Sequence, residues 1–174
     1  MRRFLVALLA GWLTLLFSAC SGESINAAEG ARRKILLVNN KDDPRWLDLH
    51  RTNSVVENNI MLALHEGLVV EGATNERDPD PRIAASWQSN PEKSVWSFQL
   101  RPDARWSDGN PITPDDFIWS WQRLLNPKLA AEYSGMLFIV KNGREIFEGK
   151  LPADQLGAKK TGPHSLEITL TGPT

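Results

Sequence analysis

The first stretch of hydrophobic residues in the chain is continuous rather than periodic. Arg2 and Arg3 form a positive start, and residues 4–17 follow as an apolar run without a charged side chain. The run has the length of a signal-peptide core and is short for a membrane-spanning helix. We therefore expect residues 1–19 to be a signal peptide that directs export and is then removed.

Small residues lead from this run into Cys20, the one cysteine of the chain. The arrangement resembles a bacterial lipobox and predicts lipid attachment at Cys20. An ordinary cleavable signal is the alternative, because Phe17 stands where the lipobox usually has Leu. One cysteine cannot form an internal disulfide, so an oxidising compartment poses no pairing problem. The polar, aperiodic residues 20–33 predict a flexible tether between anchor and fold.

Two elements are expected in the next part of the chain. The continuous apolar residues in 34–39 predict a first strand that is buried on both faces and is broken by the turn at 42–44. Residues 57–68 have helical spacing, with Ile60, Ala63 and Leu64 on one face. Gly67 stands near the end of this stretch, where a left-handed cap is often needed. Residues 73–81 are rich in turn formers and predict a surface loop.

Strict alternation marks residues 94–100 as a half-buried strand. Trp96, Phe98 and Leu100 share one face of it, so we expect Trp96 in the core. Turns are predicted at 101–104 and 106–109, where Pro102 and Gly109 favour them.

The clearest helix start lies at Thr113, which can cap backbone N–H groups. Pro114 suits the first helical position, and Asp115 and Asp116 favour the positive end of the helix dipole. The helix is expected to bury Trp121 and to stop before 126–127. A further helix at 142–148 and a strand at 166–170 complete a mixed α/β (α+β) class.

Composition describes a soluble globular protein, with 41% hydrophobic and 24% charged residues. The net charge of −1 lacks the basic excess of nucleic-acid binders. The three histidines, His50, His65 and His164, show no metal-ligand spacing. The capping role accounts for the neighbouring carboxylates at 115 and 116. We therefore expect no enzyme, no cofactor and no metal site. Seven Trp and six Phe against one Tyr stand out instead, since aromatic residues fill cores and line ligand sites.

The segment from Ser94 to Gly109 and the segment from Pro111 to Phe117 resemble the signature of extracellular solute-binding protein family 5, the peptide and nickel receptors of ABC importers. Flanking pieces agree, among them Leu47-Asp48-Leu49-His50 and Ser120-Trp121-Gln122-Arg123. The latter resembles the oligopeptide-binding branch. The resemblance covers about 34–171 and implies the N-terminal part of a two-lobed, type II-like periplasmic-binding-protein fold. Residues 34–55 would begin the hinge-bearing lobe, and 56–174 would form mostly a smaller family-specific domain.

The same resemblance implies the ligand site. An extended segment, here 52–56, would pair with a bound peptide like an added strand, so Asn53, Ser54 and Val55 are candidate ligand-binding residues. Asn53 replaces a Glu common in the family, so a preference for basic side chains is not implied. Tyr133 falls where the oligopeptide branch has a tyrosine that reaches the peptide. The implied partners are an oligopeptide and ABC importer membrane subunits, for an exported, lipid-anchored monomer.

Family members are several hundred residues longer, so the expectation is an N-terminal fragment that binds peptide weakly or not at all alone. The alternatives are a nonfunctional or interaction-only truncated lipoprotein, and a receptor for a non-peptide ligand such as nickel or haem. The reading frame past Thr174 distinguishes the first of these alternatives from a receptor.

Overall fold

A computed structural model describes residues 25–73 and 78–173. The chain divides into two compact units, 1–39 and 40–174, and each is described by itself. The expected signal peptide, 1–19, and the expected lipid attachment site, Cys20, lie outside the described residues.

The expected tether contains a helix, which corrects that prediction. Helix α2 spans Ala27–Arg33, and the side chain of Asn26 caps it by accepting a hydrogen bond from the backbone N–H of Glu29 at 2.9 Å. Alanine and arginine favour helix, and the side chain of Arg32 pairs with Glu29 one turn away. Local propensity and a cap therefore outweigh the small, polar character of this stretch.

The buried strand expected at 34–39 is absent, since the backbone there is irregular. Leu36 is 86% exposed and Val38 75%. A strand is stabilised by its neighbours, and none of the described strands pairs with these residues.

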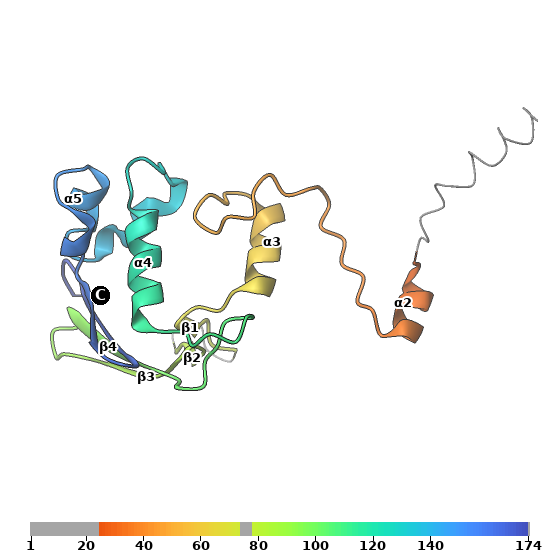
Figure 1. Cartoon of the computed structure of the whole chain (residues 1–174), viewed down its shortest axis with the longest axis horizontal. Helices are drawn as coiled ribbons and strands as arrows, with labels where there is room; N and C mark the ends of the chain where they lie inside the picture. Colours follow the sequence, from red (N-terminus) through yellow and green to blue (C-terminus); the bar gives the residue numbers. More distant parts are fainter. Residues whose placement is uncertain (1–24, 74–77, 174) are drawn as a thin grey trace, which may run out of the picture. The chain divides into compact units, whose positions relative to one another are not determined.

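The second unit is built on an antiparallel sheet of four strands (Figure 1). The strands are β3 (Ala84–Ser89), β4 (Val95–Leu100), β5 (Ala158–Gly162) and β6 (Ser165–Thr169), in the order β3-β4-β6-β5. Opposite Phe98 on β4 lies Leu166 on β6. A two-stranded sheet pairs β1 (Val69–Val70) with β2 (Asp80–Pro81), and β2 lies at the end of the loop expected at 73–81.

The predicted strands 94–100 and 166–170 are confirmed as β4 and β6, and the turns at 101–104 and 106–109 are present. The helix expected at 142–148 is confirmed as α5 (Gly143–Phe147). Two 3-10 helices were not anticipated, namely η2 (Glu132–Ile139) and η3 (Ala153–Gln155).

Helix α4 spans Pro114–Leu124 and begins as predicted. Asp116 reaches back so that its Oδ2 accepts hydrogen bonds from the backbone N–H of Thr113 at 2.7 Å and from its hydroxyl at 2.9 Å. Asp115 instead pairs with Lys160 on β5, at 2.6 Å. The two adjacent carboxylates thus point to different partners and do not form a catalytic pair.

Helix α3 spans Val55–Leu64, so it begins and ends earlier than the expected 57–68. The cap residue His65 is extended, with φ −126° and ψ 148°, and Gly67 is not left-handed. The carbonyl oxygens of Gly67 and Leu68 accept hydrogen bonds from residues 82–84 instead. Backbone pairing with the start of β3 therefore draws the chain out of the helix before Gly67.

Two hydrophobic cores fill this unit. The larger joins α4, α5, β6 and the loops between them, with Leu125, Ile146 and Leu166 buried, and in Figure 1 α4 and α5 lie over the same side of the sheet. The smaller contains Ile83, Ala84, Leu100, Ala104 and Ile112. Phe98 and Phe117 contact both cores and link them.

The two tryptophans assigned to the core differ. Trp121 packs against the larger core, with its ring 6.1 Å from that of Phe117 between centroids, as predicted. Trp96 is half-buried and belongs to neither core, which corrects the prediction. Trp96 lies on the same face of β4 as Phe98 and Leu100, but it is the second residue of the strand and lies beside the 90–94 turn. There its indole N–H donates a hydrogen bond of 3.2 Å to the carbonyl oxygen of Lys93.

No helix within 25–73 and 78–173 is both long and apolar enough to span a membrane. Across the same residues, no three His, Cys, Asp or Glu side chains gather in a way that could hold a metal ion.

Candidate functional site

The four residues predicted to bind a ligand lie on two elements that meet. Asn53 and Ser54 precede α3, Val55 is its first residue, and Tyr133 is the second residue of η2. The side-chain amide of Asn53 donates a hydrogen bond of 2.6 Å to Oε2 of Glu132, the first residue of η2. The structure therefore brings the segment before α3 to the start of η2.

The predicted extended segment 52–56 is shorter than expected. Ser54 is extended, with φ −127° and ψ 161°, but Val55 and Val56 are helical. Glu57 explains this boundary, because its carboxylate accepts hydrogen bonds from the Ser54 hydroxyl and from the backbone N–H of Arg45 at 2.9 Å. An acidic residue in the first turn favours a helix start at Val55.

Glu57 is a buried anchor that the sequence did not single out, with 1% of its surface exposed. The hydrogen bond from Ser54 and then that from Arg45 lower the pKa of its carboxyl. The Ser54 hydroxyl is thus engaged within the fold, whereas Val55 and Tyr133 are 71% and 51% exposed.

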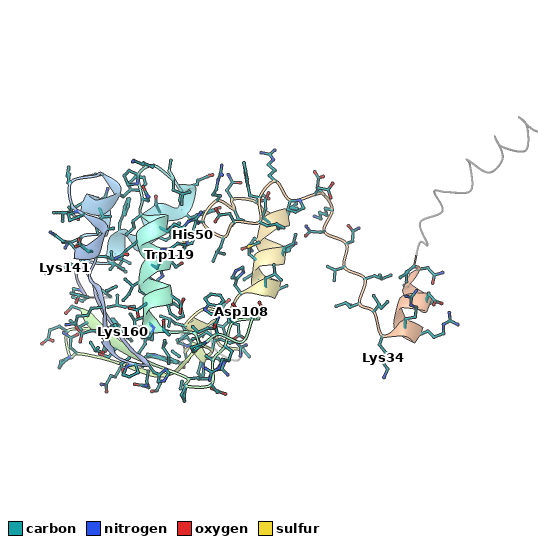
Figure 2. The ribbon with its side chains drawn as sticks, in the orientation of Figure 1. Lys34, His50, Asp108, Trp119, Lys141 and Lys160 are labelled. Carbon is teal, nitrogen blue, oxygen red and sulfur yellow. The ribbon has the colours of Figure 1, made fainter. Side chains whose placement is uncertain are left out.

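A second set of polar contacts holds the preceding loop against α4. Arg123 donates two hydrogen bonds to the carboxylate of Asp48, at 2.7 and 2.6 Å. His50 contacts Ser120 on the same helix, with 2.9 Å between Nε2 and Oγ, and its Nδ1 contacts Arg123. Figure 2 shows His50 beside α4.

This network shifts the pKa values of its members. The Arg123 guanidinium lowers the pKa of Asp48 to about 2, and Asp48 raises the pKa of Arg123. Burial, followed by the charge of Arg123, lowers the pKa of His50. His50 is therefore neutral at pH 7, and an imidazole that accepts from Arg123 at Nδ1 can donate from Nε2 to Ser120. In the sequence, Asp48 and His50 lie in one tetrapeptide that resembles the family, and Ser120 and Arg123 lie in another. Only the structure shows that their side chains contact one another.

One further contact lies within the loop that precedes Asn53. The guanidinium of Arg51 lies 3.8 Å from the ring centroid of Trp46, a distance at which cation and ring attract each other. The loop that leads to Asn53 is thus tied to α4 and to itself.

A cavity of about 640 Å³ borders this network at Leu49 and Ser120 and extends between the C-terminal end of α3, the 105–112 turn and α4. Its apolar lining includes Leu64, Trp106, Phe117 and Trp121. The four predicted site residues do not line it, so the cavity and the Asn53–Tyr133 surface are separate features.

Known proteins match this chain in sequence and in fold. The family model described as bacterial extracellular solute-binding proteins, family 5 Middle, matches residues 78–174. The periplasmic oligopeptide-binding protein OppA of Salmonella typhimurium is 38% identical over 169 residues, which cover 94% of this chain and 31% of that protein.

Solved structures match the fold. The crystal structure of Haemophilus influenzae OppA in complex with the peptide RPPGFSPFR has a TM-score of 0.72 and 35% identity, over 78% of this chain and 26% of that one. The Escherichia coli murein tripeptide binding protein MppA gives 0.72 and 35%, over 77% and 26%. The resemblance and the mixed α/β class are confirmed, and the fold is part of the periplasmic-binding-protein fold. The chain spans about a third of the length of the curated OppA.

Proposed function

The chain belongs to the bacterial extracellular solute-binding proteins of family 5, and from this premise we propose that it forms part of the peptide-binding wall of a receptor for an ABC importer. The receptor captures oligopeptides outside the cytoplasmic membrane and performs no catalysis. In this proposal residues 34–55 begin the hinge-bearing lobe, residues 56–174 form most of the smaller domain, and the receptor is a monomer.

The backbone of Asn53 carries this proposal. Its N–H and C=O make no hydrogen bond to any of the residues that the structure describes, and the adjacent Ser54 is extended. Unpaired, extended backbone can accept a peptide as an added strand, which binds many sequences because the hydrogen bonds are to the main chain. The Asp48–Arg123 contacts hold the approach to this segment in place.

Tyr133 supplies the second part of the site. Its ring is half-exposed at the start of η2, and the Asn53–Glu132 hydrogen bond holds this start against the backbone segment. A tyrosine offers contact area and a hydroxyl with little loss of rotamer entropy. Asn53, Ser54, Val55 and Tyr133 would thus contact the ligand through backbone, aliphatic and aromatic groups.

Calorimetry on the protein expressed from its complete reading frame tests the proposal. Tri- to pentapeptides of unrelated sequence should bind with dissociation constants within about tenfold of one another, because main-chain pairing dominates. Tyr133→Ala should weaken binding about fivefold or more, by loss of an aromatic contact worth roughly 1 kcal/mol or more. Leu62→Ala is the control, since Leu62 is 72% exposed on α3, seven residues beyond Val55.

Other outcomes identify the alternatives. Binding of nickel or haem without any peptide would replace the peptide proposal by a non-peptide receptor. A protein that folds but binds none of these ligands would fit an interaction-only lipoprotein.

Export and anchoring form a separate part of the proposal. Relatives named as periplasmic support export, whereas the lipid anchor rests on the sequence of residues 1–20 alone. Cys20→Ala should move the protein from the membrane fraction to the soluble fraction of the envelope. An unchanged distribution would exclude the lipid anchor.

A further inference from the structure

An acidic side chain lies beside the proposed backbone segment without a cation to balance it. Glu132 is exposed, and no ion pair among the residues the structure describes includes it. Its Oε2 accepts the hydrogen bond from Asn53, and its Oε1 has no partner in the same part of the chain. The Asn53 amide orients the carboxylate but does not neutralise it, since an amide carries no net charge.

Two basic side chains that hold the neighbouring loop, Arg51 within it and Arg123 on α4, are engaged elsewhere. Arg51 lies over the ring of Trp46, and Arg123 is held by Asp48. A free carboxylate oxygen suits a cation, because it accepts charge-assisted hydrogen bonds. Tyr133, the next residue of η2, is 51% exposed, and an aromatic face also attracts cations.

We propose that Glu132 is a specificity-determining residue that favours peptides with a cationic group, an ammonium or a guanidinium, beside the Asn53 segment. The proposal rests on the peptide-binding function above. It changes the expectation drawn from Asn53 alone, where a neutral residue implied no preference for basic side chains. The structure places a carboxylate from position 132 next to position 53, so the negative charge comes from a different element.

Two peptide series measured by calorimetry separate the sources of the cation. The first series compares lysine with norleucine at each position of a tetrapeptide, and the second compares a free with an acetylated N-terminus. One of these changes should alter affinity by roughly tenfold, the size expected for a hydrogen bond to a charged group. The preference should shrink as salt concentration rises, because the site is exposed.

Glu132→Gln keeps an oxygen that can accept from Asn53 and removes the charge. It should reduce the preference, measured as the ratio of the dissociation constants for the neutral and the cationic peptide, to about twofold or less. Glu92→Gln is the matched control, since Glu92 is an exposed residue in the β3–β4 turn, and it should retain the preference. The double variant Asn53→Glu/Glu132→Gln returns a carboxylate to the pair and should restore the preference.

The outcomes distinguish the two proposals. Peptides that bind without a cationic preference, or a preference that survives in Glu132→Gln, would overturn the role of Glu132 and leave peptide binding intact. Failure of every peptide to bind would overturn the peptide-binding proposal and this one with it.

Discussion

Asp48 and Arg123 face each other across two hydrogen bonds, of 2.7 and 2.6 Å, that fasten a loop to helix α4. Each side chain is 30% exposed, so the pair is neither a surface ion pair nor a fully buried one. Two parallel bonds also fix the orientation of the guanidinium. The loop that this pair holds leads directly to the proposed ligand-binding segment.

Removal of this pair should destabilise the fold. Arg123→Met should lower the free energy of unfolding by about 1–2 kcal/mol, between the values typical of exposed and buried pairs. Urea denaturation measures the change. Lys150→Met is the control, because it breaks the more exposed pair of Lys150 with Glu148 and should cost less than about 0.5 kcal/mol. Equal losses in the two variants would show that the Asp48–Arg123 contact is not special.

Acid should weaken the same contacts in two steps. The pKa of His50 is lowered in the folded state, so the unfolded state binds the proton more readily. The stability contributed by neutral His50 is complete above its unfolded pKa of 6.5 and is lost as pH falls through the folded pKa. The pKa of Asp48 is lowered from 3.8 to about 2, so its contribution is lost only between these values.

Thermal unfolding between pH 7.5 and 5 tests the first step. The melting temperature of the wild type should fall over this range. The melting temperature of His50→Gln should fall less steeply over the same pH range, because an amide can occupy both hydrogen-bonding positions without taking up a proton. Parallel curves for the two proteins would contradict the role assigned to His50.

Neighbouring aspartates at the start of α4 should differ in their effect on stability. Asp116→Ala removes the acceptor of two hydrogen bonds from Thr113 and should cost about 1 kcal/mol, the usual size for loss of a helix cap. Asp115→Ala removes only an exposed pair with Lys160 and should cost less. Urea denaturation measures both changes in the free energy of unfolding. A larger loss in Asp115→Ala than in Asp116→Ala would show that the cap does not stabilise the helix.

A buried and an exposed leucine should differ in how much stability is lost when each is replaced by alanine. Leu166 is fully buried, whereas Leu62 on α3 is 72% exposed. Leu166→Ala should cost about 2–5 kcal/mol through lost burial and a cavity. Leu62→Ala should change stability by about 0.5 kcal/mol or less. A large loss from Leu62→Ala would mean that α3 is covered in solution.

Local patterns predicted the elements whose interactions are themselves local. Alternation identified β4, and the cap at Thr113 with Pro114 identified α4. The prediction of a strand at 34–39 was wrong. An apolar run indicates that burial is favourable, but it does not supply a partner strand. β3 was missed because its sequence, Ala-Ala-Ser-Trp-Gln-Ser, does not alternate between apolar and polar residues. The candidate residues followed from resemblance. Glu57 had a local signal, since Ser54 and Glu57 have the spacing of a capping box, whereas Glu132 had none.

The sequence by itself determined the family, the mixed α/β class, the start of α4 and the alternation of β4, because each depends on periodicity or on groups within a few residues. Tertiary structure alone decided that His50 meets Ser120 and that Asn53 meets Glu132, 79 positions later in the chain. Those contacts depend on how the sheet and helices pack, and chain connectivity does not constrain side chains so far apart. The charge at the proposed ligand site is therefore a property of the fold.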